Sequence, residues 1–133
     1  MKISHKTLEF QTKDEFDFID FTNDVEKFIS SSQIKNGLVN IQTMHTTAPL
    51  FLNENEPLLL EDFKKHLSQI SPKNAAYNHD DFARRTVNMC SGECQNGHSH
   101  CEALHFPSNL VLNIIDGKMQ LGQWQRIFLM ELD

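Results

Sequence analysis

Two segments near the start of the 133-residue chain show hydrophobic alternation. Residues 3–11 carry β-formers in a loose alternation, which predicts a first strand. Residues 38–44 alternate more strictly and predict a second strand, with Val39 and Ile41 sharing one of its faces. The following stretch, residues 46–55, fits either a strand or a loop.

The C-terminal third has the clearest strand pattern. An apolar run at residues 109–115 leads into Asp116-Gly117, a dipeptide typical of two-residue hairpin turns. Residues 118–121 then predict a returning strand, Gly122 interrupts the pattern, and residues 124–132 predict a long final strand.

Helical spacing marks two other segments. Thr22 is a good N-cap residue, and the apolar positions after it keep helical spacing as far as Asn36-Gly37, which tolerates the left-handed conformation that ends a helix. A second helix is predicted to begin at Pro57 and to end before Ser71-Pro72. Its apolar positions fall at i, i+4, i+8 and i+11, namely Leu59, Phe63, Leu67 and Ile70. Residues 73–83 are polar and predict a loop.

The order of these elements predicts an α+β fold. Short strands around two main helices, without a βαβ repeat, indicate a compact, mostly antiparallel β-sandwich. A length of 133 residues leaves room for one core, so residues 1–133 are expected to form a single domain. The chain contains neither a G-x-G-x-x-G sequence nor a P-loop, and we therefore expect no nucleotide cofactor.

The charge of the chain bears on its partners. Twelve basic and eighteen acidic residues give a formal net charge of −6, whereas non-specific capture of nucleic acid requires a cationic field. No stretch approaches the ~18 consecutive apolar residues of a membrane helix. We therefore expect a cytoplasmic protein that binds neither nucleic acid nor a membrane. In that compartment the three cysteines are expected to be free thiols or metal ligands.

Polar residues follow the second predicted strand. His45, Thr46 and Thr47 stand where that strand ends, and Asn53 and Glu54 come shortly afterwards. A histidine, an amide and a carboxylate that lie close together could orient a substrate and move a proton. Spacing alone favours the simpler interpretation, in which the histidine sits at a strand edge and the other two residues precede a helix.

A second polar cluster combines cysteine with histidine. Cys90, Cys94, His98 and His100 are soft or borderline metal ligands within a short stretch. In a strand the two histidines would share a face. In a helix Cys90, Cys94 and His98 would align instead, an option that nearby glycines weaken. The spacing matches no standard zinc ribbon, so a bound zinc or magnesium ion and a site without metal both stay open.

Other charged residues have simple interpretations as well. His79 stands beside Asp80 in a polar stretch, where a solvated loop is the simpler interpretation. Arg84-Arg85 is either a surface pair or a clamp for a phosphate group. The three remaining histidines are expected to be structural or exposed, namely His5, His66 and His105.

Taken in order, these motifs are similar to those of one known family. The chain contains His45-Thr-Thr-Ala, Asn53-Glu54, His79-Asp80 and Gly97-His98-Ser-His100, followed by Asp116-Gly117-x3-Leu121-Gly122-x-Trp124-Gln125-x-Ile127-x-Leu129-x-Glu131. The ordered series extends over nearly the whole chain and is far more specific than any single motif. On these residues the chain resembles the YjbQ-like family, also called the secondary thiamine-phosphate synthase family.

The resemblance implies a compact α+β fold with a β-sandwich, assembled as a homotrimer with sites near subunit boundaries. It also implies a small phosphorylated metabolite as substrate and a weak thiamine-phosphate synthase activity. That activity joins phosphorylated pyrimidine and thiazole precursors. The stretch Cys90-Ser-Gly-Glu-Cys94 is not general in the family, so a metal site there is not carried over from other members.

These considerations assign expected roles to thirteen residues. The expected catalytic residues are His45, Asn53, Glu54 and His79. The expected substrate contacts are Thr46, Thr47, Arg85, Gly122 and Gln125. The expected ligands of a divalent metal are Cys90, Cys94, His98 and His100. Two alternatives stand beside this hypothesis, a non-catalytic metal- or metabolite-binding protein and a metal-assisted phosphohydrolase.

Overall fold

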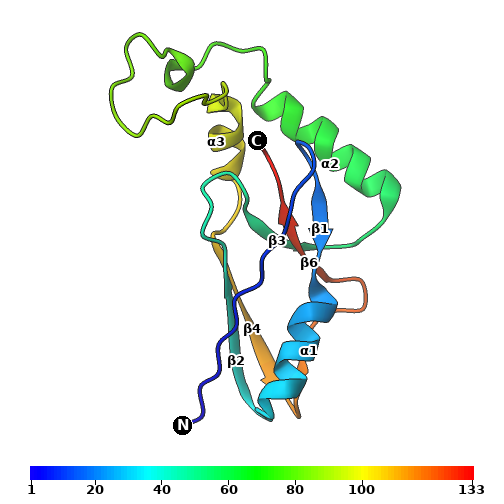
Figure 1. The fold of residues 1–133 in the computed structure, drawn as a ribbon. Coiled ribbons are helices and arrows are strands. Elements are labelled where there is room, and N and C mark those ends of the chain that lie inside the picture. Colours follow the sequence, from blue (N-terminus) through cyan, green and yellow to red (C-terminus); the bar gives the residue numbers. More distant parts are fainter.

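The strands form two three-stranded antiparallel sheets (Figure 1). The computed structural model describes all 133 residues. The first sheet has the order β1 (Phe18–Asp20), β6 (Arg126–Met130), β3 (Leu50–Asn53), and the second has the order β2 (Gly37–Gln42), β4 (Asn109–Ile115), β5 (Lys118–Met119). The α-helices are α1 (Thr22–Ser32), α2 (Pro57–Ile70) and α3 (Gly97–Ala103), and one 3-10 turn, η1, spans Asn78–Asp80. The predicted α+β class is confirmed.

The first sheet lies between two apolar layers because both of its faces are hydrophobic. On one face, Leu50 and Ile127 pack with residues of α1 and of the second sheet. On the other face, Phe51, Phe128 and Met130 pack against α2. Burying a large apolar side chain of this kind stabilises the fold by about 2–3 kcal/mol. Successive side chains of β6 therefore point into two different hydrophobic cores, one on each side of the sheet.

The predicted strand at 38–44 and the predicted hairpin are both confirmed. Val39 in β2 is 8% exposed and its neighbour Leu38 is 65% exposed, so the alternation separates a buried face from a solvent face. Between β4 and β5, Asp116 has φ 51° and Gly117 has φ 77°. Positive φ at both central residues is what a type I′ turn requires.

Helix α1 is capped differently from the prediction. Thr22 is its first helical residue, and the capping oxygen comes from Asp20, whose Oδ1 accepts hydrogen bonds from the backbone N and the Oγ1 of Thr22 at 3.1 and 2.7 Å. The helix ends at Ser32 because Gln33 adopts the left-handed conformation with φ 57°. The end predicted at Asn36-Gly37 therefore comes too late.

Helix α2 has the predicted bounds. Pro57 is its first residue, and Ser71 is its C-cap. The carboxylate of Glu56 caps the N-terminus by accepting hydrogen bonds from the backbone N of Leu58 and Leu59 at 2.9 and 2.8 Å.

The segment at residues 3–11 forms no strand, which corrects the first prediction. Its backbone makes no hydrogen bonds to other backbone groups. Leu8 and Phe10 pack against the core, and the rings of Phe10 and Phe21 lie 5.2 Å apart. The segment runs alongside β2 and α1 without pairing (Figure 1). Its apolar pattern therefore reflects burial, which a strand and an unpaired extended segment share.

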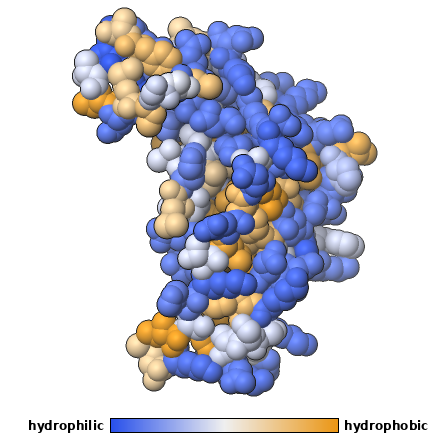
Figure 2. All heavy atoms as spheres, viewed as in Figure 1, coloured by the Kyte–Doolittle hydropathy of each residue, from blue (hydrophilic) through white to orange (hydrophobic).

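Most of the surface seen in Figure 2 is hydrophilic. Hydrophobic residues reach this surface near the middle of the view and at its lower end. The outward face of the second sheet contributes exposed apolar side chains such as Leu38 and Val111. No helix is both long and apolar enough to cross a membrane.

Candidate functional site

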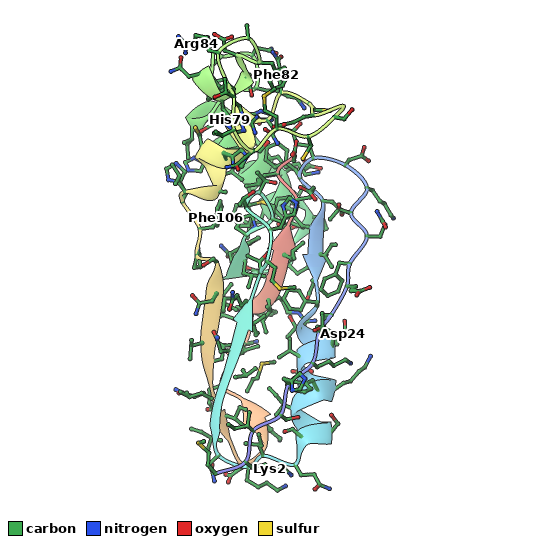
Figure 3. The ribbon with its side chains drawn as sticks, turned by 60° about the vertical axis from the view of Figure 1, so that its left-hand side comes forward. Lys2, Asp24, His79, Phe82, Arg84 and Phe106 are labelled. Carbon is green, nitrogen blue, oxygen red and sulfur yellow. The ribbon has the colours of Figure 1, made fainter.

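One end of the molecule gathers several of the histidines named above. There β2 ends, α3 lies close to the C-terminus, and the long connection from α2 to α3 extends outward (Figure 1). Figure 3 shows His79 at this end, beside α3 and opposite to the end that carries Lys2. We call this region the histidine end; its histidines are His45, His79, His98 and His100.

Helix α3 begins at Gly97, although the glycines in this stretch disfavour a helix. Asp80 supplies the missing stabilisation, because its Oδ1 accepts hydrogen bonds from the backbone N of Asn96 and Gly97 at 3.1 and 2.9 Å. Those are donors that a helix N-terminus otherwise leaves unpaired. Residues 90–96 stay outside the helix. The stretch is therefore neither the strand nor the longer helix that the sequence allowed.

Gly97 also permits a close approach between α3 and the loop that precedes Asp80. A Cβ atom at Gly97 would lie 2.5 Å from the Cβ of Tyr77 and 2.8 Å from its Cγ. The Cβ of Tyr77 is fixed to its backbone, so the loop would have to move away from α3.

Replacing Gly97 with alanine is expected to lower the free energy of unfolding by about 1–3 kcal/mol, the usual cost of overpacking. Urea unfolding followed by circular dichroism measures the change. The matched control is Gly37→Ala, where the nearest atom to the new Cβ is 3.5 Å away. That variant should stay within about 1 kcal/mol of the wild type. Equal losses in the two variants would show that the contact with Tyr77 is not what matters.

His79 and His100 form an imidazole pair across the gap between η1 and α3. Their rings lie 4.7 Å apart, edge to face. The Nε2 of His79 is buried without a hydrogen-bond partner, and its distance of 4.0 Å to Oε1 of Glu93 is too long for a hydrogen bond. A buried polar atom left unpaired is costly, so this nitrogen lacks the partner that such an atom normally has.

The electrostatic surroundings keep His100 neutral. Burial lowers the pKa of His100 below its ordinary value of 6.5, and the positive charge of His79 lowers it further. Asp133 opposes this shift in the pKa, whereas Arg85 and His45 add to it. At pH 7 the His100 ring can therefore accept a proton.

His45 stands at the end of β2 on the same side of the molecule. Its Nδ1 accepts a hydrogen bond from the backbone N of Thr47 at 3.3 Å and lies 3.1 Å from the Oγ1 of Thr47. Because Nδ1 is an acceptor, the proton of the neutral ring lies on Nε2. His45 is exposed, and its charge reaches His100. The structure therefore brings His45 towards the imidazole pair, with Thr47 fixing its tautomer.

His98 belongs to the opposite side of α3. Residues two apart on a helix point in nearly opposite directions, so His98 and His100 do not share a face. The His98 ring is 3% exposed, and its Nε2 lies 3.2 Å from Oε1 of Glu15. Glu15 also pairs with Lys73. The expectation that His98 and His100 bind one ion together is therefore wrong for this geometry.

Glu102 lies one helical turn after His98. It is 1% exposed, and neither of its carboxyl oxygens has a hydrogen-bond partner. Burial is the main cause that raises the pKa of Glu102, to about 7, and the negative charge of Glu15 adds to the shift while Lys73 opposes it. This carboxyl is consequently protonated in a large fraction of molecules at neutral pH.

The two arginines of the predicted phosphate clamp are already paired. The guanidinium of Arg85 contacts the carboxylate of Glu93 and donates hydrogen bonds to the backbone O of Val87 at 3.3 Å and of Asn88 at 2.6 Å. Arg84 pairs with Asp81 at 2.9 Å. Arg85 therefore organises its own loop and acts on His100 through its charge.

Asn53 and Glu54 lie far from the histidine end. Asn53 pairs with Arg126, the first residue of β6, whereas the backbone O of Thr47 accepts a hydrogen bond from Leu132, just after β6. The six residue steps from Arg126 to Leu132 correspond to about 20 Å of extended chain. The predicted grouping of histidine, amide and carboxylate is therefore not formed within one chain.

The four predicted metal ligands are not gathered in one place. Cys90 and Cys94 are exposed on the loop before α3, and His98 and His100 point to opposite sides of that helix. No three histidine, cysteine, aspartate or glutamate side chains are arranged to hold a metal ion. This donor set does not fit a zinc or magnesium centre built from the four residues.

The remaining predicted substrate contacts do not lie together: one is close to His45 and two are close to Asn53. Thr46 is exposed next to His45. Gly122 and Gln125 form the turn before β6, where Oε1 of Gln125 accepts a hydrogen bond from the backbone N of Gly122 at 2.7 Å. Both therefore lie near the Asn53 end of the sheet, where they stabilise a turn.

The contacts that Glu15 and Asp133 make at the site could not be predicted from the sequence. Glu15 meets His98 from 83 positions away, and Asp133 accepts a hydrogen bond from Nδ2 of Asn96 at 2.6 Å. Only Glu102 had a local signal, because it stands four positions after His98 and would share a helix face with it. The spacing of His98 and Glu102 is informative only in a helix, and the nearby glycines disfavoured a helix from the sequence.

Comparisons with known proteins point to one family. Residues 6–133 match the model of the family described as UPF0047 protein YjbQ-like. The UPF0047 protein of Methanothermobacter thermautotrophicus is 33% identical over 133 residues, which is 100% of this chain and 85% of that protein.

Two solved structures have the same fold. A YbjQ-like protein of unknown function from Sulfolobus solfataricus superposes with a TM-score of 0.81 at 31% identity, covering 93% of this chain and 82% of that one. An uncharacterised conserved protein of the YjbQ/UPF0047 family from Clostridium acetobutylicum superposes with a TM-score of 0.79 at 31% identity, covering 93% and 87%. The likeness in sequence and in fold thus extends over nearly the whole chain.

Proposed function

The chain belongs to the YjbQ-like UPF0047 family, and we propose that it is an enzyme that acts on a small phosphorylated metabolite at the histidine end. The observation that supports this most is the pair formed by His79 and His100. The two rings are 4.7 Å apart, and the buried Nε2 of His79 has no partner within the protein. Two imidazoles that contact one ligand can supply both a general acid and a general base.

The charges around the pair suit an anionic substrate. His100 is neutral at pH 7 because its pKa is lowered by burial and by neighbouring positive groups. A bound phosphate would offset those positive charges and raise the pKa of His100. Binding would then be linked to uptake of a proton, and the protonated ring would stabilise charge on the substrate. His45, which is exposed at the same end and has its proton on Nε2, adds a hydrogen-bond donor.

The specific reaction that we propose is a weak, secondary thiamine-phosphate synthase activity. A C–N bond forms between the thiazole nitrogen and the methylene carbon of the pyrimidine, while the C–O bond to diphosphate breaks and diphosphate leaves with the electron pair. The ordered motifs shared with the family support this reaction. Histidine cations would stabilise the leaving group, but Arg84 and Arg85 are already paired, which fits a slow activity. A magnesium ion would enter with the diphosphate as part of the substrate.

An assay with the diphosphorylated pyrimidine and the thiazole phosphate tests this function. His79→Gln and His100→Gln are each expected to lower the rate of thiamine phosphate formation by about 10- to 100-fold, because a general acid–base group is removed. His5→Gln is the matched control, since His5 is exposed on the N-terminal segment. Circular dichroism shows that each variant is folded. The assay is run with and without magnesium.

Three results would contradict the proposal. Full activity in both folded histidine variants would remove the imidazole pair from the reaction. One-to-one binding of the precursors without turnover would instead favour a metabolite-binding protein. Release of inorganic phosphate without thiamine phosphate would identify a phosphohydrolase that uses the same end of the molecule.

We also propose that the protein works as a homotrimer, as the resemblance implies. Asn53 lies about 20 Å from the histidine end within one chain, so a neighbouring copy is the simplest way to bring the two together. Leu38, Met44 and Val111 are 65%, 88% and 54% exposed on the outward face of the second sheet and its extension, and they offer apolar surface for such contacts. Light scattering should give three times the 15.4 kDa mass of the chain. A monomer would overturn this proposal.

A further inference from the structure

A separate pocket of about 270 Å³ lies on the face of the first sheet that α2 covers. Its walls come from every strand of that sheet, from α2 and from the segment after α3. None of its residues belongs to the histidine end. In Figure 3, Phe106 lies below α3, whereas His79 lies beside the upper part of that helix. Within one chain the pocket is therefore separate from the histidine end, and Asn53 is the one lining residue that the proposed trimer would bring towards the histidine end of a neighbouring copy.

The interior of this pocket is aromatic. Phe51, one of its lining residues, is 8% exposed. The ring of Phe51 meets that of Phe63 nearly at right angles at 6.1 Å, that of Phe18 nearly at right angles at 6.1 Å, and that of Phe106 at 5.8 Å. Aromatic walls in these orientations accept another planar ring, edge to face or stacked. A volume of 270 Å³ is slightly below that of drug-sized sites, so one ring with a small substituent fits.

None of the polar residues that line the pocket is acidic. His66 from α2 and His105 from the segment after α3 are both exposed and line the opening, and Asn53 contributes its amide. The Nζ of Lys64 lies 5.8 Å from the ring centroid of Phe18, another wall residue. No lining residue is acidic, although the chain has eighteen acidic residues. Imidazole and amide N–H groups donate hydrogen bonds, and the ammonium group of Lys64 is close by, so the opening suits an anion although the net charge of the protein is negative.

We propose that this pocket binds a small aromatic molecule that carries one anionic group. The ring lies among Phe51, Phe63 and Phe106, and the anion lies at the opening between His66 and His105. Recognition uses both parts, because the aromatic walls offer no hydrogen-bond donors and the two histidines at the opening do. The anion is a phosphate or a carboxylate, which share this chemistry and are separated by experiment.

Calorimetric titration with phenyl phosphate, benzoate and inorganic phosphate tests the proposal. The wild type is expected to bind at least one of the two aromatic anions about tenfold or more tightly than inorganic phosphate, because only they fill the aromatic part. Phenyl phosphate and benzoate compared with one another identify the preferred anion. Affinity for neither of them, or affinity no better than for inorganic phosphate, would overturn the proposal.

A blocking variant locates the site. Ile70 lines the pocket at the end of α2 and is 42% exposed, so Ile70→Trp should fill the pocket without disturbing the core. Binding of the aromatic anion is expected to fall by about tenfold or more. Leu58→Trp is the matched control, since Leu58 is 67% exposed on the same helix and does not line the pocket. Equal binding by the two variants would place the ligand elsewhere.

Recognition of the anionic group of the ligand is tested by the double variant His66→Gln, His105→Gln. It is expected to weaken binding of the aromatic anion by about tenfold while leaving saturation-transfer signals of neutral benzyl alcohol unchanged. Loss of benzyl alcohol binding as well would mean that the histidines shape the pocket and do not recognise charge, which would overturn the anionic assignment. The thiamine phosphate assay does not use these residues, so the two proposals can fail separately.

Discussion

Replacing Asp20 with alanine is expected to lower the free energy of unfolding by about 3 kcal/mol. Its carboxylate joins segments that are distant in sequence. Oδ1 accepts hydrogen bonds from the backbone N and Oγ1 of Thr22, and Oδ2 accepts hydrogen bonds from Asn55 at 2.9 Å and from Nε of Arg126 at 2.7 Å. The side chain of Asp20 is 14% exposed, so its loss leaves the partly buried guanidinium of Arg126 without its partner.

The pH dependence of stability gives a second test of the same carboxylate. Burial raises the pKa of Asp20, but the hydrogen bonds from Arg126, Thr22 and Asn55 outweigh it and lower the pKa from 3.8 to about 2. The pKa is thus lower in the folded state than in the unfolded state. The stabilisation is present above about pH 4 and is lost as the pH falls towards 2. Asp20→Ala should lack that part of the acid dependence.

Urea unfolding at pH 7 and at pH 3 measures both effects. Asp24→Ala is the matched control, because Asp24 lies in the first turn of α1 and pairs only with exposed Lys27 at 3.9 Å. It is expected to change stability by less than about 1 kcal/mol. If Asp20→Ala were as mild as Asp24→Ala, the network around Arg126 would not be a main tertiary contact.

The second large effect is expected at Glu102, whose burial should make the fold less stable as the pH rises. The pKa of Glu102 is about 7 in the folded protein, against an ordinary value of 4.5. Because the folded state holds this proton more tightly, the associated stability is present below about pH 4.5 and is lost as the pH rises through 7. The shift corresponds to about 3 kcal/mol in total, of which about 2 kcal/mol falls between pH 5 and pH 8.

Glu102→Gln should remove most of this dependence. The amide keeps the shape of the protonated carboxyl and cannot ionise, so the variant should match the wild type near pH 5 and exceed its free energy of unfolding at pH 8. Urea unfolding at both values gives the difference between the two proteins, which cancels the titration of the histidines. Glu26→Gln, at an exposed position of α1, is the control and should follow the wild type. Parallel curves for wild type and Glu102→Gln would show that Glu102 is already ionised at pH 5.

Much of the fold could be predicted because the relevant signals are local. The alternation in β2, the dipeptide Asp116-Gly117 and the apolar stripe of α2 each lie within one element or one turn. The strand predicted for the N-terminal segment is wrong because alternation indicates only which side chains are buried. Leu8 and Phe10 pack against the core, but their backbone pairs with no strand. Helix α3 was disfavoured because its cap, Asp80, is sixteen residues from Asn96 in the sequence.

The candidate site could be predicted only in part. The sequence singled out His79 and His100, and the structure pairs them at 4.7 Å. It also grouped His45 with Asn53, but the antiparallel pairing of β3 with β6 carries Asn53 away from the histidine end. Short separation in sequence is no measure of distance when an extended strand lies between two residues.

By itself, the sequence determined where most helices and strands lie and which side of each is apolar, because periods of 2 and 3.6 residues are properties of neighbouring positions. Only the tertiary structure decided which side chains meet. Glu15 reaches His98, and Asp20 reaches Arg126, across 83 and 106 positions. Such contacts depend on the order of strands in a sheet and on the face that each element buries, and spacing within a single element specifies neither.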